Sequence, residues 1–272
     1  GNIVSVVDYT NTFQTGNLTI TPNGSQKIGG VNASAVLSTE GQSVTFVYVD
    51  DTEGWKNVQD STSNATGRQF ISATGGTVTT VNCGACKVHT FTGPGTFCVS
   101  SASTTADENI VSYLVIGGGG GGGYCMGGGG GAGGYREIKS PTTPYTASPL
   151  DGYATPANRV TITAQAYPIV VGGGGAGSSG PASANPTPKG TPGVNSTFST
   201  ITGAGGGGGG SRNYGYCGIA GGSGGGNSND SPPSNTNPAG NTPPVTPAQG
   251  QPGGFGRGNT GVNVSAGGGG AT

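Results

Sequence analysis

The residues best suited to redox or metal chemistry lie in one short stretch of the chain. Cys83 and Cys86 have the C-x-x-C spacing of a redox motif or of half a zinc site. Cys98 and His89 follow closely and would complete four zinc ligands. A local disulfide, between Cys83 and Cys86 or from one of them to Cys98, competes with zinc, and we predict the disulfide and no bound metal. His89, the single histidine, lies on an expected strand, which favours a surface residue over a catalytic base.

A second cluster with ligand character consists of the three carboxylates Asp50, Asp51 and Glu53. Carboxylate oxygens bind Ca²⁺, but a segment rich in Asp and Gly at the tip of a hairpin also forms a tight turn without a metal. We therefore predict a turn at this position.

A formal G-x-G-x-x-G motif follows the apolar segment 111–116. The dinucleotide fingerprint requires a helix after these glycines to hold the pyrophosphate, and here more glycine follows. The chain also has no Gly-Lys-Ser/Thr sequence, which excludes a P-loop. We expect no cofactor, no catalytic residues and no enzymatic activity.

The elements that must position these side chains are dominated by glycine and proline, which make up 61 and 18 of the 272 residues. Leu and Met are scarce and 8% of the residues are charged, so amphipathic helices lack good helix formers. We predict essentially no α-helix. The net charge of −1, without a Lys/Arg cluster, offers no driving force for binding nucleic acid. No apolar stretch is long enough to cross a membrane. We therefore expect neither nucleic acid nor a membrane as a partner.

The first part of the chain is typical of short strands separated by turns. Alternating polar and apolar residues with β-branched or aromatic content mark the segments 17–21, 35–38, 43–49 and 55–58. We predict a β-hairpin module over residues 1–60 for fibre formation or oligomerisation, because so short a chain buries too little surface alone. Residues 61–116 are expected to be a β connector. Its hairpin, residues 87–100, would place Phe91 opposite Phe97.

Most of the glycine, 48 of 61 residues, follows position 116 in runs that come after short apolar strands. A flexible linker is the ordinary interpretation of such runs, but a linker needs folded bodies on both sides. Glycine also forms an extended helix with three residues per turn, whose backbone groups must bond to neighbouring chains. We therefore predict an all-β protein plus a polyglycine-II helix bundle, residues 117–272, with projecting loops. The runs are 117–134, 172–180, 203–210, 218–226, 250–258 and 266–270.

Two Tyr-Cys pairs, Tyr124-Cys125 and Tyr216-Cys217, stand between glycine runs in similar settings. Ordering glycine costs much conformational entropy, so a cross-link would help the bundle. We predict a disulfide between Cys125 and Cys217.

Large side chains beside the glycine runs cannot enter a backbone core, so they either cover its faces or stand in its end loops. Tyr and Arg in exposed loops are frequent recognition residues, and Tyr stacks on sugars. The candidates for receptor contact are Tyr124, Tyr135, Arg136, Arg212, Tyr214, Tyr216, Phe255 and Arg257.

Two parts of the chain resemble proteins of bacteriophage fibres. Asn17-Leu-Thr-Ile-Thr-Pro-Asn-Gly24, continuing to Val58, resembles the β-hairpin module of phage tail-fibre and other appendage proteins, including those of cyanophages. Residues 87–100, Tyr113-Leu-Val-Ile-Gly117 and the later runs resemble the glycine-rich domain of phage tail proteins, which is similar to the tip adhesins of T-even-like phages. The loop 227–249 departs from that pattern, so the receptor does not carry over.

The resemblance implies a phage fibre protein whose glycine-rich domain recognises a host-surface receptor, either a bacterial surface glycan or an outer-membrane protein. It also implies a virion or extracellular location, a homo-oligomer, with a homotrimer favoured, and other virion proteins as partners. The alternative is a purely structural role as virion decoration, head fibre or subunit of an extracellular filament. Ice binding by a flat face is a third hypothesis, but the loops 135–158, 178–198 and 227–249 favour recognition or assembly.

Overall fold

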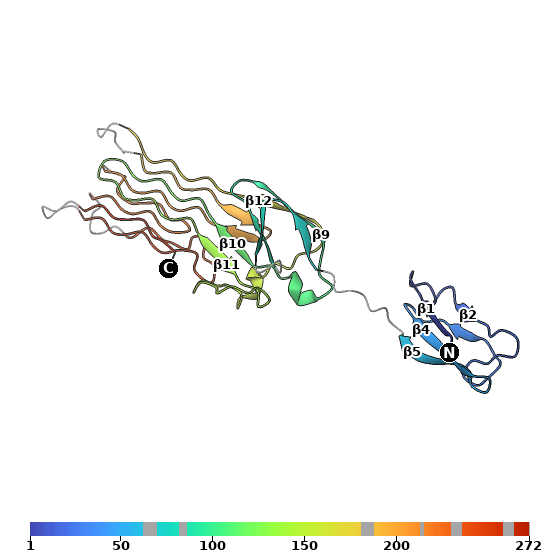
Figure 1. Ribbon diagram of the computed structural model, residues 1–272. Coiled ribbons are helices and arrows are strands. Elements are labelled where there is room, and N and C mark those ends of the chain that lie inside the picture. The colour runs from blue at the N-terminus through green and yellow to red at the C-terminus, as the bar shows by residue number, and fades with distance from the viewer. Residues whose placement is uncertain are drawn as a thin grey trace. The chain divides into compact units, whose positions relative to one another are not determined.

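The computed structural model describes residues 1–61, 70–81, 86–180, 188–212, 215–229, 236–257 and 264–271. It forms two compact units, Gly1–Gly67 and Arg68–Thr272, so the predicted connector and glycine-rich domain largely share one unit. The regular structure consists of small antiparallel sheets (Figure 1). In the described part of the chain the helical segments are two 3₁₀ turns, η2 (Ala106–Asn109) and η3 (Pro156–Asn158). The prediction of a β protein essentially without α-helix is confirmed.

The first unit contains a three-stranded sheet and a two-stranded one. Strand β4 (Ser43–Asp50) lies between β1 (Ile3–Val7) and β5 (Gly54–Ser61), and β2 (Leu18–Ile20) pairs with β3 (Ala35–Leu37). Val44 and Phe46 point inward from β4, as alternation along a strand requires, and bury against Leu37. Strand β1 is the one strand of this unit that the sequence patterns did not identify.

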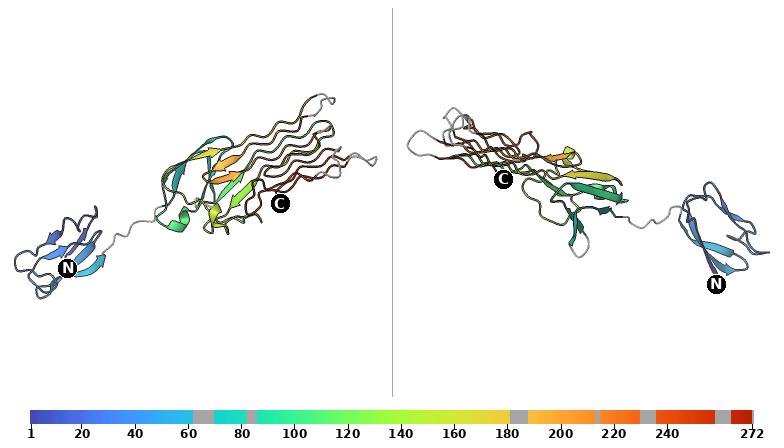
Figure 2. Two further views of the ribbon diagram at one scale, coloured as in Figure 1. Left: turned by 180° about the vertical axis from the view of Figure 1, so that it is seen from behind. Right: turned by 90° about the horizontal axis from the view of Figure 1, so that it is seen from above.

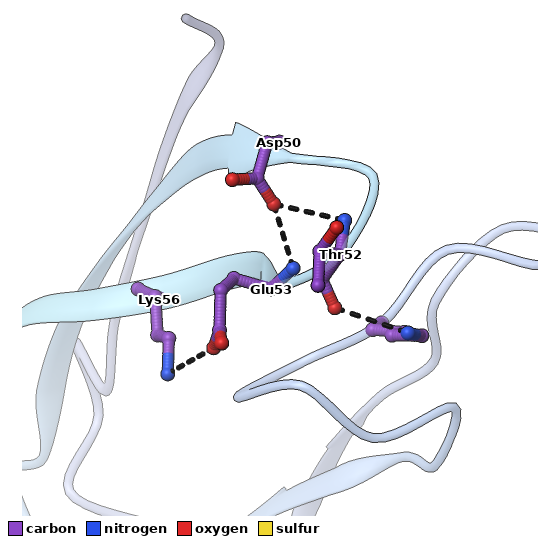
Figure 3. Close-up of polar contacts among 5 residues, drawn as sticks. Asp50, Thr52, Glu53 and Lys56 are labelled. Carbon is purple, nitrogen blue, oxygen red and sulfur yellow. Dashed lines mark hydrogen bonds and ion pairs between the residues drawn. The ribbon is translucent and has the colours of Figure 1, made fainter.

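The turn between β4 and β5 is closed by the Asp50 carboxylate (Figure 3). Its Oδ1 accepts the backbone N–H groups of Thr52 at 2.8 Å and Glu53 at 2.7 Å. Glu53 in turn forms an ion pair with Lys56 at 2.6 Å. The predicted turn is confirmed, because the Asp50 carboxylate binds the backbone of the residues that connect the two strands.

A buried carboxylate, Asp8, holds the loop that follows β1. It is 1% exposed, and its two oxygens accept the backbone N–H groups of Thr12 and Phe13 at 2.9 Å and of Gly41 at 3.1 Å. Burial acts to raise the pKa of Asp8, but the backbone hydrogen bonds outweigh it and hold the pKa below its ordinary value. The charged form of Asp8 is therefore part of the folded structure.

Acid is expected to destabilise the first unit through Asp8. Because the pKa is lower in the folded than in the unfolded chain, the stabilisation is present above about pH 4 and is lost as the pH falls through the folded value. Asp8→Asn should be less stable at neutral pH and less sensitive to acid than the wild type. Denaturant unfolding at pH 7 and pH 3, followed by the fluorescence of the single tryptophan, Trp55, measures both. Equal acid sensitivity of the two proteins would assign the effect to other groups.

The second unit begins with a layer of strands. One sheet has the order β14-β13-β12-β9-β6, and two separate pairs join β7 to β8 and β10 to β11. Its core gathers Val99, Val115, Ile162, Tyr167 and Phe198 from these strands and the adjoining loops. The strands are β6 (Ser72–Thr74), β7 (Thr77–Val81), β8 (Cys86–Thr90), β9 (Gly95–Ser101), β10 (Tyr113–Ile116), β11 (Tyr135–Ile138), β12 (Ala166–Val170), β13 (Ser196–Phe198) and β14 (Ile201–Gly203).

The predicted hairpin 87–100 is wrong. Strand β8 pairs with β7, whereas β9 pairs with β12 and β6, so the chain changes sheets at the Gly-Pro-Gly turn. Phe97 consequently lies opposite Tyr167 and not opposite Phe91. The chain does change direction at this sequence, but β8 and β9 each pair with other strands and not with one another.

Glycine-rich runs extend side by side from this β layer (Figures 1 and 2). They are joined by backbone hydrogen bonds between runs that are distant in sequence. We number them run 1 (117–123), run 2 (128–134), run 3 (172–178), run 4 (190–194), run 5 (204–210), run 6 (221–229), run 7 (250–256) and run 8 (264–271).

The hydrogen bonds of run 1 repeat every three residues. N–H groups at every third position donate to run 2, those one residue later donate to run 4, and C=O groups two residues later accept from run 3. A chain with three residues per turn presents its backbone groups in this way. The predicted polyglycine-II helices require the same threefold pattern. The three sets are Gly117, Gly120 and Gly123; Gly118 and Gly121; and Gly119 and Gly122.

Runs 5 and 6 form the centre of this lattice and are buried along their whole length. Run 6 bonds to runs 2, 5, 7 and 8 and to the carbonyl groups of Ile219 and Ala239. The packing leaves no room for side chains: a Cβ on Gly120 would lie 2.1 Å from the carbonyl oxygen of Gly207. The core of the second unit is therefore partly aliphatic and aromatic, in the β layer, and partly bare backbone.

Candidate functional site at the loop end of the runs

The candidate site lies where the glycine-rich runs turn back, at the end away from the β layer. Run 1 leaves β10 and run 2 returns to β11, so the turn at residues 124–127 is at the far end, and run 5 leads from β14 to the same end. We call the described residues there, 124–127, 211–212, 215–217, 228–229 and 255–257, the loop end.

Hydrogen bonds hold the first two of these segments together. The N–H of Tyr124 donates to Ser211 Oγ at 2.8 Å, and the N–H of Arg212 donates to the Tyr124 carbonyl at 3.5 Å. Ser211, which is fully buried, also donates its hydroxyl to the Pro188 carbonyl at 2.5 Å. Tyr124 and Arg212, both half-buried, are thus neighbours on the loop end.

Met126 connects the same turn to the end of run 6. Its carbonyl accepts the N–H of Asn229 at 3.3 Å and the hydroxyl of Ser265 at 2.6 Å, and its sulfur accepts from Asn229 Nδ2 at 3.2 Å. The N–H of Ser228 donates to the Tyr216 carbonyl at 2.8 Å. Met126 is 50% exposed, so a rigid backbone supports an exposed apolar side chain here.

Five of the eight predicted contact residues lie at this loop end. Besides Tyr124, Arg212 and Tyr216 these are Phe255, half-buried, and Arg257, exposed. Arg257 exchanges two backbone hydrogen bonds with Val264, at 3.0 and 3.1 Å, which fixes its place between runs 7 and 8. Tyr214 lies outside the described residues.

Tyr135 and Arg136 do not join the loop end. Both are on β11, at the opposite end of the runs. Arg136 is 8% exposed and donates to Asn158 Oδ1 at 2.7 Å, and the Tyr135 hydroxyl donates to Glu137 at 3.0 Å. Burial leaves Arg136 unable to contact a receptor, and both residues support the junction between runs and β layer.

The four described cysteines, Cys86, Cys98, Cys125 and Cys217, have free thiols, and Cys83 lies outside the described residues. The predicted disulfide between Cys125 and Cys217 is not formed. Backbone hydrogen bonds hold the two turns instead, from Asn229 to Met126 and from Ser228 to Tyr216. A disulfide between Cys86 and Cys98, one form of the predicted local bridge, is not formed either, and the two residues lie on strands of different sheets. Where the structure describes the chain, no group of three His, Cys, Asp or Glu residues could hold a metal ion.

Sequence patterns missed the polar residues beneath the loop end. Ser211, Ser228 and Asn229 are at most 1% exposed, and Ser211 and Asn229 bind the backbone or side chain of neighbouring turns. In the sequence these residues are marked only by their position, because each stands where a Ser or Asn ends a run of glycines. Of the three side chains, that of Ser211 pairs with backbone groups, the N–H of Tyr124 and the carbonyl of Pro188, which a further glycine would leave without this partner.

The arrangement defines a class of protein: a β layer that carries a lattice of glycine-rich runs, with aromatic and basic residues in the loops at its far end. Residues 90–272 match the family model of a glycine-rich domain, and the chain belongs to this glycine-rich domain family. No significant match was found among curated proteins or among solved structures. No helix in the described ranges has the length and apolar character needed to cross a membrane.

Proposed function

We propose that this protein is a subunit of a phage fibre and that its glycine-rich domain recognises a receptor on the bacterial surface. The observation that carries the proposal is the loop end, where Tyr124, Arg212, Tyr216 and Arg257 are supported by a lattice almost without side chains. Loops on such a lattice can change in sequence without disturbing the core, which suits a recognition surface.

The side chains of the loop end favour a surface glycan or an outer-membrane protein as receptor. Tyr supplies large contact area with a polar group at low entropic cost, Arg supplies several hydrogen-bond donors, and the exposed Met126 adds an adaptable apolar contact. Several copies in one fibre, with a trimer favoured, would raise the effective affinity of individually weak contacts. A virion location with other virion proteins as partners completes the proposal.

A purely structural role in the virion or in an extracellular filament is the second candidate. The extended hydrogen-bonded lattice favours it, because such a lattice suits a mechanical or lateral-packing unit as well as a platform for loops.

Binding of the fluorescently labelled full chain to a panel of bacterial strains tests the proposal. We expect binding to at least one strain and a loss of about tenfold or more in the double variant Tyr124→Ala/Arg257→Ala, the size typical of recognition residues. Thr92→Ala, at an exposed position outside the loop end, is the matched control and should bind as the wild type does. Unchanged binding in the double variant would contradict the assigned site, and no binding to any strain would favour the structural role.

A further inference from the structure

One face of the glycine lattice is not covered by any residue that the structure describes. Run 6 has neighbours on all sides, but run 1 bonds to runs 2, 3, 4 and 5 and run 2 to runs 1, 5, 6 and 8. Runs 3, 1, 2 and 8 therefore lie in a row, with the other runs on one side of it. We call the opposite side of this row the bare face.

The residues that point out of the bare face recur at intervals of three and are almost all glycine. There are eight such positions, of which six are exposed and two, Gly122 and Gly129, are half-buried. The eight positions are Gly119 and Gly122 in run 1, Gly129 and Ala132 in run 2, Gly174 and Gly177 in run 3, and Gly267 and Gly270 in run 8.

Packing inside this chain does not require glycine on most of the bare face. A Cβ on Gly119, Gly122 or Gly177 would find its nearest atom at 3.8 Å, and one on Gly267 or Gly270 would meet nothing within 4 Å. Each such glycine costs about 0.4–1 kcal/mol relative to alanine through the entropy of the unfolded chain. A reason outside the chain is needed for a surface without side chains, and close approach of another backbone is such a reason.

The bare face also offers unused hydrogen-bonding groups and no charge. The N–H groups of Gly119 and Gly122 donate to no residue that the structure describes, although their neighbours along run 1 do. Residues 117–134, 172–178 and 264–271 contain no Asp, Glu, Lys, Arg or His. A complementary surface must be flat, uncharged and free of side chains, with backbone groups at the same threefold spacing.

The surface of this chain that meets these requirements is the bare face itself. We propose that two copies of the protein associate through their bare faces, each supplying the layer of glycine helices that the other lacks. The contact is self-complementary, as a twofold interface requires. A seven-residue run spans only ~22 Å, so the interface is small and the association is weak.

Sedimentation equilibrium of the full chain from about 10 µM to about 1 mM tests the proposal. We expect the average mass of the wild type to rise with concentration toward twice its value at high dilution, and hydrogen exchange at residues 117–122 to slow in parallel. The double variant Gly119→Glu/Gly267→Glu places two charges on the bare face where a Cβ fits, and it should lose both effects while keeping the wild-type melting temperature. Thr92→Glu, outside the bare face, is the matched control and should behave as the wild type does.

The outcomes separate this contact from other events. Oligomerisation through the first unit would persist in the double variant, so the difference between the proteins reports on the bare face alone. A wild-type mass independent of concentration, or equal association of the double variant, would overturn the proposal. Inhibition of ice recrystallisation by the wild type, lost in the double variant without any self-association, would assign the bare face to ice instead. None of these outcomes bears on whether the loop end binds cells, because the cell-binding experiment tests that proposal separately.

Discussion

Gly120→Ala is expected to abolish cooperative folding of the glycine-rich runs or to destabilise them by more than about 3 kcal/mol. The added methyl would lie 2.1 Å from the carbonyl oxygen of Gly207 and 2.6 Å from its carbonyl carbon. Overpacking an ordinary core costs about 1–3 kcal/mol because side chains move aside. Here both contacts are backbone, and moving either run breaks hydrogen bonds to several others.

Thermal unfolding followed by the polyproline-II band in circular dichroism measures this effect. Gly173→Ala is the matched control, because a Cβ at Gly173 meets nothing within 4 Å. The Gly173→Ala substitution should leave the melting temperature unchanged or raise it, because it adds at most about 1 kcal/mol to the free energy of unfolding. Equal, small effects of the two substitutions would contradict the lattice. A gradual, non-cooperative loss of the band in the wild type would indicate flexible linkers and not a folded bundle.

Gln249→Ala is expected to destabilise the second unit by about 2–4 kcal/mol, through a lost buried hydrogen bond and a cavity. Gln249 is fully buried where the runs meet the β layer. Its Oε1 accepts the N–H of Ala204 at 2.9 Å, and its Nε2 donates to the Pro243 carbonyl at 2.8 Å. Truncation leaves the N–H of the buried Ala204 without a partner at the start of run 5.

The same unfolding measurement applied to Thr92→Ala supplies the control for Gln249. Thr92 is exposed in the same unit, and its truncation should change the stability by less than about 0.5 kcal/mol. Similar effects of the two variants would show that Gln249 does not join the runs to the β layer.

The two largest effects have a common origin in a core made of backbone. An aliphatic core tolerates exchange among residues of similar size, but the central glycines have no smaller or equal substitute. Change is therefore confined to the loops and to outward positions such as Ala132. This division supports both proposals, because recognition uses the loops and self-association uses the bare face.

Local patterns in the sequence were sufficient for much of the fold. Alternation predicted β2 to β5, scarcity of helix formers predicted a β protein, and the Asp50 turn followed from its composition. The same reasoning placed Tyr124, Tyr216 and Arg257 in loops beside glycine runs. These features depend on residues close in the chain, which is the range over which sequence patterns act.

Pairings between distant segments could not be predicted in the same way. The Gly-Pro-Gly sequence at the start of β9 predicts a hairpin with β8, but β9 pairs with β12 and β6. Arg136 carries the same charge as Arg257, yet one is buried on β11 and the other is exposed at the loop end. The four described cysteines remain unpaired although their spacing suggested disulfides.

The sequence by itself determined that backbone makes up much of the core after residue 116, because 48 of the 61 glycines lie there, mostly in runs. Only the tertiary structure decided which glycines are enclosed and which are outward. Gly120 and Gly119 are identical and adjacent in sequence, but the threefold turn directs one toward run 5 and the other to the bare face. Without side chains, glycines differ only in their neighbours, and neighbours are assigned by packing.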